Sequence, residues 1–199
     1  MDFSIIDKKV MENNEFEIKN ELINDELLLQ INDRYSENVK KFFNNCIIEV
    51  DFSKIRLQYF NFIECRIKAN FINCFFDYCS SYKSKWDTTT LNMATWSHCE
   101  LSSDDFDNCD LSKSTIEKSD FSSCTLKKCN LKNCNTNLSK IHSCKFLFSD
   151  LSYSVHHITD CTCSVFQNCS LINARFAECD LRGVEWEIEE DKKEGLVIH

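Results

Sequence analysis

Proline is absent from the 199-residue chain, and glycine occurs only at Gly183 and Gly195. These are the usual turn residues, because glycine tolerates positive φ and proline presets a negative φ. Any turns in this protein must therefore be built from Asn, Asp, Ser, Lys and Cys. The scarcity of both residues also argues against flexible linkers, and the length suits one domain or a small pair.

Several signals of other protein classes are missing as well. No apolar run approaches the roughly 20 residues of a membrane span. The N-terminal segment MDFSIIDKKVMENNEFEIKN has no basic end followed by an apolar stretch, so we expect no secretory signal and a cytosolic protein without membrane contact. There is no Gly-rich phosphate loop, HExxH or GxSxG motif. We therefore expect no enzyme activity and no cofactor.

Cysteine, in contrast, is abundant, with 14 in the chain. Without a secretory signal, a disulfide framework is a weak interpretation. No CxxC pair occurs, and structural zinc sites usually need two close ligand pairs, so we expect no metal. The dominant spacing is five residues, as in CTLKKCNLKNC, where cysteines stand at Cys124, Cys129 and Cys134.

The five-residue period extends from Phe71 to Trp186. Every fifth residue in this range is large and apolar at 20 of 24 positions, with exceptions at Ser81, Thr136, His156 and Cys161. Two places earlier stands a small residue, with Asp104 as the sole charged member. Cysteine shares this track with Ala, Ser and Thr, which indicates a small buried residue rather than a reactive thiol. Cys46 and Cys163 lie off the tracks, and we expect them to react first.

This pattern resembles the pentapeptide-repeat family, whose unit is loosely A-(D/N)-L-x-x. The match is carried by CDLSK at 109–113, SDFSS at 119–123, CNLKN at 129–133, SDLSY at 149–153 and CDLRG at 179–183. The resemblance implies an all-β solenoid, a right-handed quadrilateral β-helix with four pentapeptides per coil. The large residue and the small residue before it would both point inward. Residues 20 apart should then stack, and columns such as Phe71, Leu91, Leu111, Leu131, Leu151 and Leu171 keep their chemical type.

The register divides the chain into three parts. Residues 1–45 lack the repeat and are expected to form an N-terminal cap with a helix at 24–43, where Asn24 or Asp25 could be the N-cap. Residues 46–186 would form the β-helix, irregular over 46–70 and regular over 71–186. Upstream of the regular part, five residues step by five, namely Ile47, Phe52, Leu57, Phe62 and Ile67. The step from Ile67 to Phe71 is four, which indicates a deletion at a corner. Residues 187–199 would be a C-terminal tail or cap.

One inward residue is a candidate for chemistry. His156 takes a large inward position, with Thr136 one coil before it and Cys161 next inside. A His/Cys/Thr group could bind a metal or sense pH. The favoured interpretation is a core histidine that is hydrogen-bonded to a neighbour, as buried polar groups require.

Two surface features are candidate contact sites. The residues before one set of inward positions form a stripe with four acids, Glu100, Asp120, Asp160 and Asp180, interrupted by Lys140. Six outward apolar residues are expected to form a contact patch: Leu138, Leu147, Phe148, Tyr153, Val155 and Ile158. Such a patch suggests a protein partner or a homodimer contact. The net charge of −9 is otherwise consistent with a solvated surface of mixed sign.

The family resemblance also implies a function. Pentapeptide-repeat proteins of this size include quinolone-resistance and microcin-immunity proteins, which bind DNA gyrase or topoisomerase IV as acidic mimics of DNA and protect it from inhibitors. That resemblance predicts a non-enzymatic protein that binds a type II topoisomerase and does not bind nucleic acid directly. The alternative is a protein-interaction scaffold or a secreted bacterial effector with no role at topoisomerases.

Overall fold

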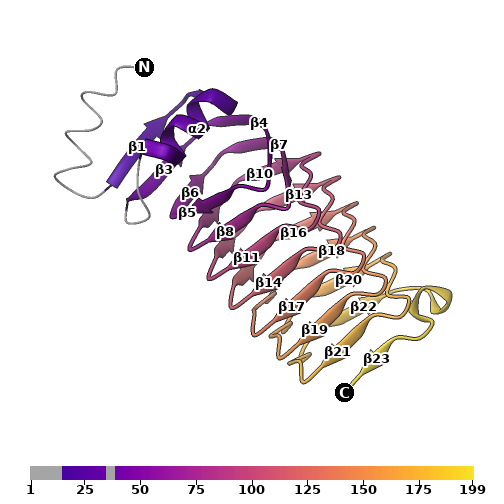
Figure 1. Ribbon diagram of the computed structural model, residues 1–199. Coiled ribbons are helices and arrows are strands. Elements are labelled where there is room, and N and C mark those ends of the chain that lie inside the picture. The colour runs from indigo at the N-terminus through magenta and orange to yellow at the C-terminus, as the bar shows by residue number, and fades with distance from the viewer. Residues whose placement is uncertain (1–14, 35–38) are drawn as a thin grey trace.

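Parallel strands, each paired with a strand one coil away, form the framework of the computed structural model (Figure 1). The structure describes residues 15–34 and 39–199. The strands in the first coils are β1 (Glu15–Lys19), β2 (Leu22–Ile23), β3 (Lys40–Asn44), β4 (Ile47–Ser53), β5 (Arg56–Gln58), β6 (Phe60–Ile63) and β7 (Arg66–Ile72). Among the described residues the only α-helix is α2 (Asp25–Arg34).

The remaining strands are mostly three residues long. They are β8 (Phe75–Asp77), β9 (Ser80–Tyr82), β10 (Lys85–Asp87), β11 (Thr95–Ser97), β12 (Glu100–Ser102), β13 (Asp105–Asp107), β14 (Thr115–Glu117), β15 (Asp120–Ser122), β16 (Thr125–Lys127), β17 (Asn135–Asn137), β18 (Lys145–Leu147), β19 (Val155–His157), β20 (Val165–Gln167), β21 (Arg175–Ala177), β22 (Glu185–Glu187) and β23 (Val197–Ile198). A short 3₁₀ helix, η1 (Glu190–Lys193), precedes β23.

These strands form a rod with four faces. Face A is the sheet β1-β3-β6-β9-β12-β15, continued by bridges from Asp120 to Asp180. Face B is the sheet β2-β4-β7-β10-β13-β16-β18-β20-β22, and face C is the sheet β23-β21-β19-β17-β14-β11-β8-β5. Face D consists of bridges from Asn70 to Ser170. The chain visits A, B, D and C in turn, so face C lies opposite face B and face A lies opposite face D. The prediction of an all-β solenoid is confirmed.

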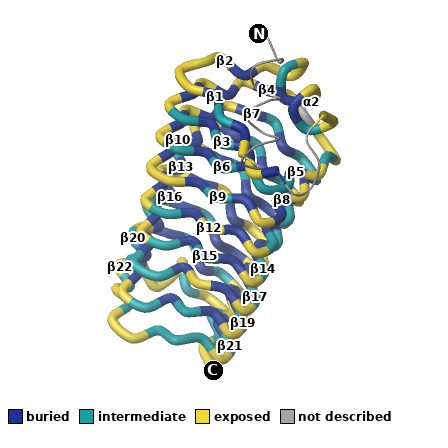
Figure 2. Tube along the Cα trace, turned by 90° about the vertical axis from the view of Figure 1, so that its left-hand side faces the viewer, coloured by how far each residue is buried: buried dark blue, intermediate teal, exposed yellow. Residues whose placement is uncertain are grey.

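Residues 20 apart lie in register along each face. Trp96 pairs with Ile116, and Leu126 pairs with Phe146. The large residue of each pentapeptide and the small residue two places before it are buried over most of the rod, whereas the other three positions face outward (Figure 2). One interior side chain therefore stacks on the next, and the two inward tracks of the sequence form a continuous core.

The corners show how the chain turns with so little glycine and proline. Every fifth residue from Asn73 to Gly183 has a positive φ. L-residues enter this region at a steric cost, but here their amides are bonded to the following coil. The amide of Ser103 donates to the Ser122 carbonyl at 3.1 Å, for example. Asn, Ser and Lys occupy many of these corners, as expected, but Tyr, Leu, Phe and Ile occur there too.

The small inward residues also donate hydrogen bonds. The Cys144 thiol donates to the Phe121 carbonyl one coil earlier at 2.8 Å, and the Ser149 hydroxyl donates to the Leu126 carbonyl at 3.0 Å. The Cys169 thiol donates to the Phe146 carbonyl in the same way, and burial raises its pKa to about 11, so a buried thiol of this kind keeps its proton at neutral pH. Cysteine is therefore chosen for more than its volume, because it supplies a weak donor to a buried corner carbonyl.

The first coils depart from the sequence prediction. The helix expected at 24–43 is present only as α2, which ends at Arg34, and Lys40–Asn44 form β3 instead. β3 pairs with β1 along its whole length, so strand pairing begins before residue 46. Residues 35–38 of the expected helix lie outside the described residues. The predicted N-cap is confirmed at Asn24, whose side chain accepts the Leu27 amide at 3.0 Å.

One corner of the early coils is straightened. β4 and β7 are seven residues long and pair throughout, and neither has a positive-φ residue at the corner between faces B and D. The step of four from Ile67 to Phe71 is thereby explained. In the preceding coil Ile48 is the buried residue, whereas Ile47, which the five-residue step had placed inside, is 47% exposed. Cys46 is buried, so its expected position off the inward tracks is wrong, whereas Cys163 is exposed as expected.

The C-terminal residues extend the rod. The amide of Leu171 donates to the Lys192 carbonyl at 2.8 Å in the η1 segment, and β23 pairs with β21 through Phe176 and Ile198. Ile188 is buried against the core, and Leu196 packs partly buried beside it. The tail thus covers the last regular coil on faces D and C.

The stacking predicts a sharp difference between adjacent residues. Leu126 is buried between Phe106 and Phe146, and Lys127 is exposed. Leu126→Ala should lower the free energy of unfolding by roughly 2–5 kcal/mol, as truncations of core side chains do. Lys127→Ala should change it by no more than about 0.5 kcal/mol. Urea unfolding measures both, and equal losses would contradict the five-residue phase.

The thiol hydrogen bonds predict a second difference. Cys144→Ala removes the donor to the Phe121 carbonyl and leaves it unsatisfied in the core, which should cost about 1–3 kcal/mol. Cys144→Ser keeps a donor of the type that Ser149 provides, and we expect it to retain most of the stability. Thermal unfolding of the two variants tests this, and an equal loss in both would show that volume alone matters at this position.

Candidate protein-binding surfaces

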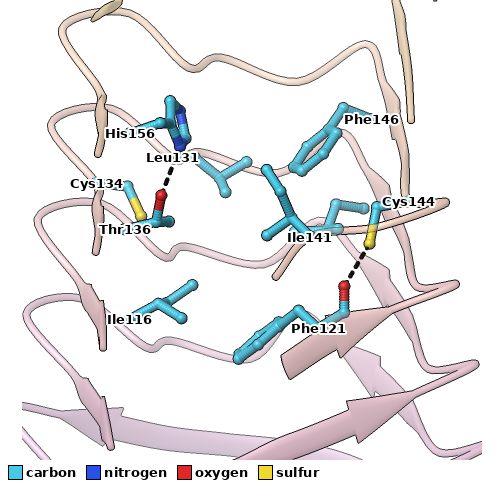
Figure 3. Close-up of a pocket in the computed structure, with 10 residues that line it drawn as sticks. Ile116, Phe121, Leu131, Cys134, Thr136, Ile141, Cys144, Phe146 and His156 are labelled. Atoms are coloured by element: carbon cyan, nitrogen blue, oxygen red, sulfur yellow. Dashed lines mark hydrogen bonds between the residues drawn. The ribbon is translucent and has the colours of Figure 1, made fainter. Parts of the chain in front are cut away.

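The interior of the rod contains a histidine whose hydrogen bonds are all satisfied. His156 is bonded through Nδ1 to the Thr136 hydroxyl at 2.8 Å (Figure 3). Its Nε2 is bonded to the Ser154 hydroxyl at 3.0 Å, and the ring stacks on Phe176. Burial lowers the pKa of His156 to about 4, so the ring is neutral at physiological pH. The favoured interpretation of a core histidine is therefore supported.

A small cavity lies beside this histidine in the same part of the core. Its volume is about 10 Å³, and its walls include Leu131, Ile141 and Phe146 (Figure 3). That is about the space of one water molecule, too small for a substrate. Two open grooves of about 360 and 370 Å³ lie on the first coils of face B. The first is lined by residues that include Cys46, Glu64 and Arg66, and the second by residues that include Glu49, Lys68 and Lys85.

The described residues contain neither a metal-ligand cluster nor a membrane-spanning helix. In residues 15–34 and 39–199, no three His, Cys, Asp or Glu side chains gather as a metal ion would require. In the same ranges, no helix has both the length and the apolar character to cross a membrane.

One buried acid is an exception inside the rod. Asp104 has no exposed surface; its Oδ1 accepts the Ser84 amide at 2.6 Å, and its Oδ2 has no partner. Burial raises the pKa of Asp104 to about 7, opposed by the Ser84 amide and the nearby Ser81 hydroxyl. Three further buried polar atoms without partners among the described residues belong to the preceding coil, namely Ser81 Oγ, Trp86 Nε1 and Trp96 Nε1.

The acidic stripe is present as a column on face A. Glu100 pairs with Asp120, and bridges continue through Lys140 to Asp160 and Asp180. The Lys140 ammonium lies 3.5 Å from the Asp120 carboxylate, and the Arg182 guanidinium lies 2.5 Å from that of Asp180. Among the described residues, Glu100 and Asp160 have no ion-pair partner. Two of the four acidic charges in the stripe, those of Asp120 and Asp180, are thus neutralised by ion pairs within the chain.

The acids before inward residues also have a structural task. Asp160 Oδ1 accepts the Thr162 amide at 2.9 Å, and on face D Asp150 Oδ1 accepts the Ser152 amide at 2.9 Å. Asn130 makes the same contact with the Lys132 amide at 3.1 Å. An acceptor two residues before a backbone amide stabilises a turn whether or not it is charged. The fold alone therefore accounts for Asp or Asn at this position of the repeat, and no binding partner is needed to explain these residues.

The expected apolar patch is not one surface. Val155 lies on face C, Leu138 and Ile158 lie at the edge between faces C and A, and Tyr153 lies at the edge between D and C. Leu147 lies on face B, and Phe148 lies at the edge between B and D. Because face B is opposite face C, the last two residues are separated from the other four. The prediction of six contiguous residues is corrected to four around face C.

Sequence reasoning missed further residues of this surface. Phe75 on face C is 52% exposed, Tyr78 at the C–A edge is 48% exposed, and Met93 at the D–C edge is 45% exposed. Tyr78 stacks between Tyr59 and His98, with ring centroids 5.5 and 4.7 Å away. All of these could have been found by extending the 20-residue columns to outward positions over the early coils.

Comparison with known proteins identifies the repeat. The family model described as pentapeptide repeats matches the chain in eight copies, over residues 99–137 and 159–185. The match covers coils whose inward tracks and corners have the geometry described above. The matched residues are therefore pentapeptide repeats, and the flanking coils continue the same five-residue geometry. No curated protein matches it at a significant level.

Three solved structures show partial similarity to this chain. HetL, involved in heterocyst differentiation regulation in the cyanobacterium Nostoc sp. strain PCC 7120, is 15% identical over 88% of this chain and 85% of its own, with a TM-score of 0.47. Full-length QnrB1, a plasmid-mediated fluoroquinolone resistance protein, is 13% identical over 88% and 95%, with a TM-score of 0.44. AT2G44920 from the Arabidopsis thaliana thylakoid lumen is 12% identical over 47% and 68%, with a TM-score of 0.42.

The buried acid predicts a pH dependence of stability. A folded-state pKa of about 7 against an ordinary value of 3.8 means that Asp104 favours folding most below pH 4 and progressively less as the pH rises to 7. Asp104→Asn keeps the acceptor for the Ser84 amide and removes this penalty. The variant should be more stable than the parent at pH 8, by up to roughly 4 kcal/mol, and similar to it near pH 4.

Urea unfolding across pH 4–8 measures the difference. Asp105→Asn is the matched control, because Asp105 is the exposed neighbour and its neutralisation should leave the pH profile almost unchanged. His156 has the opposite effect on the pH dependence of stability. Its pKa is lowered from 6.5 to about 4 in the folded state, so the free energy of unfolding decreases as the pH falls below 6.5. Profiles of parent and Asp104→Asn that stay parallel over the whole range would contradict the assignment.

Proposed function

We propose that this protein is a non-enzymatic binding protein that presents face A to a basic surface of a protein partner. The observation that carries the proposal is the stacked column from Glu100 to Asp180, which has four acids in five positions. Neighbouring coils place these acids about 4.8 Å apart. The partner that the family resemblance implies is a type II topoisomerase, DNA gyrase or topoisomerase IV, whose DNA groove is basic.

The local charges define how such a contact would work. Glu100 and Asp160 are the members of the column without an ion pair among the described residues, so they carry most of its attraction. Lys140 lies between them and would repel a basic groove. The acids also stand about 4.8 Å apart, against about 3.4 Å per phosphate along one DNA strand. A partner would therefore be held by two separated groups of charge rather than by a continuous stripe.

The direct test is gyrase supercoiling with and without a quinolone, together with binding to gyrase at low and high salt. Glu100→Gln with Asp160→Asn removes two charges and keeps the Oδ1 acceptor for the Thr162 amide, as Asn130 does in its own coil. We expect affinity at low salt to fall roughly tenfold or more. Lys140→Gln should strengthen binding, and added salt should weaken it in all proteins.

Face D offers a matched control on the opposite side of the rod. Asp110→Asn with Asp150→Asn removes the same number of charges, and both positions cap a backbone amide as Asp160 does. This variant should bind like the parent. An equal loss of gyrase affinity in the face A and face D double variants would show that only net charge matters. If the parent protein shows no detectable gyrase binding at low salt, the topoisomerase is not the partner.

A second candidate function is a protein-interaction scaffold with no role at topoisomerases. The observation that favours it is the group of exposed apolar residues on face C and its edges, including Phe75, Tyr78 and Ile158. Contact surfaces are enriched in such residues, above all tyrosine. In this case binding to a partner would resist salt and would be insensitive to the Glu100 and Asp160 substitutions.

A further inference from the structure

Exposed apolar side chains are concentrated on one side of the rod. Between residues 56 and 187, nine large apolar side chains are exposed: Phe75, Tyr78, Tyr82, Met93, Leu138, Phe148, Tyr153, Val155 and Ile158. Seven of these nine lie on face C or at its two edges, and only Tyr82 and Phe148 lie elsewhere. One face with two edges is well under half of a four-sided rod, so the side that contains face C is a contact surface.

The charges on this surface are segregated between its two edges. The D–C side of face C carries Lys54, Arg56, Lys113 and Arg175 and, in the described chain, no acid at the corner or at the first strand position. The C–A side carries the acids Asp77, Glu117 and Glu178, with Lys118 as the only Lys or Arg. Arg56 binds Asp77 within the chain at 2.6 Å. Glu117 lies 3.7 Å from the Lys118 ammonium and Glu178 lies 3.6 Å from the His157 imidazole of the same chain. The D–C edge is thus basic, and the C–A edge is acidic in net charge with its acids partly compensated within the chain.

A second copy of the chain can satisfy both edges at once, but only in one arrangement. If two copies meet through face C with a twofold axis parallel to the rods, the D–C edge of each copy faces the C–A edge of the other. If the axis is perpendicular to the rods, each basic edge faces a basic edge. We propose that the protein forms a parallel twofold dimer through face C. An isologous contact of this kind makes every favourable pair twice.

The residues at each level of the rod support this arrangement. With the rods parallel and the axis along them, each coil faces the same coil of its partner. Phe75 then meets Tyr78 of the second copy at the level of β8, and Val155 meets Ile158 at the level of β19. Arg175 meets Glu178 at the level of β21. Apolar residues thus face apolar residues, and a base faces an acid.

At the middle of face C the charges of the two copies are less complementary. At the level of β14, the corner residue Lys113 of one copy lies opposite the corner residue Lys118 of the other, with Glu117 beside it. The Lys118 ammonium lies 3.7 Å from the Glu117 carboxylate of its own chain, so that charge is partly compensated before association. The two ends of face C therefore contribute more to the contact than its centre.

The size of the surface sets the strength of the dimer. Seven strands from β5 to β21 at about 4.8 Å, and a face about four residues wide at roughly 3.3 Å each, give roughly 400 Å² of flat area per copy. Stable dimers usually bury more than this, and interfaces near the lower limit are weak and transient. We therefore expect a dimer whose population rises with concentration through the micromolar range.

The first experiment measures the molar mass of the full chain by sedimentation equilibrium from about 5 to 500 μM. Val155→Glu should leave the protein a monomer over this range. Val165→Glu is the matched control, because Val165 has the same strand position on the opposite face B and should dimerise like the parent. A monomeric parent throughout, or the same loss in both variants, would overturn the proposal.

The second experiment tests the parallel arrangement by exchanging charges. Arg175→Glu alone and Glu178→Arg alone should each weaken the dimer several-fold at low salt. The double variant restores one base opposite one acid in both halves of the contact, so its dimer should recover. Additive losses in the double variant would exclude the parallel twofold axis. The face A substitutions at Glu100 and Asp160 should leave dimerisation intact, so failure here is distinct from failure of the partner proposal.

Discussion

Backbone hydrogen bonds between neighbouring coils determine the shape of this protein. Because residue n must lie beside residue n+20, every coil returns to the same place, and each inward side chain stacks on one of its own column. The exception shows how strict this rule is. Two successive coils lack one residue at the same corner, so Val50 still pairs with Ala69 and the ladder is kept. The register returns to 20 in the next coil, where Lys85 pairs with Arg66 but Thr90 pairs with Asn70, and the amide of the additional corner residue Thr88 donates to the Asp107 carbonyl at 2.9 Å.

The same constraint decides what the interior tolerates. Three of the four corners leave carbonyl groups facing inward, and short side chains with a donor satisfy them: Cys, Ser and Thr, as in Cys109 to Trp86 and Thr89 to Ile67. Where the corner after face D closes as a turn, the backbone bonds itself, as in Ala94 to Leu91 at 3.0 Å. Alanine is accepted there because no carbonyl needs a side chain. Asp104 breaks this rule, which is why its carboxyl group has the raised pKa.

The period of five predicted the two inward tracks and the position of His156 on one of them, and the family resemblance predicted the four faces. The period failed where spacing is ambiguous. Ile47 and Ile48 are both apolar neighbours, and only strand pairing decides that Ile48 is inside. Tyr35, Val39 and Phe42 fit a helix on one side, but Lys41 and Phe43 are the buried pair in β3. The six-residue patch failed because nearness in sequence was taken for nearness on the rod, although Phe148 and Ile158 are on different edges.

Outward columns constrain the choice of residue less than inward columns, because a side chain there does not have to pack inside the rod. That freedom is unequal between columns. The residue before each large inward residue is often held by a turn amide, so an acid such as Asp180 is accounted for by the fold before any partner is considered. The corner residues and the first strand position on face C make no comparable contact. Exposed Phe75, Tyr78 and Val155 therefore weigh more as evidence of contact than an equal number of acids on face A.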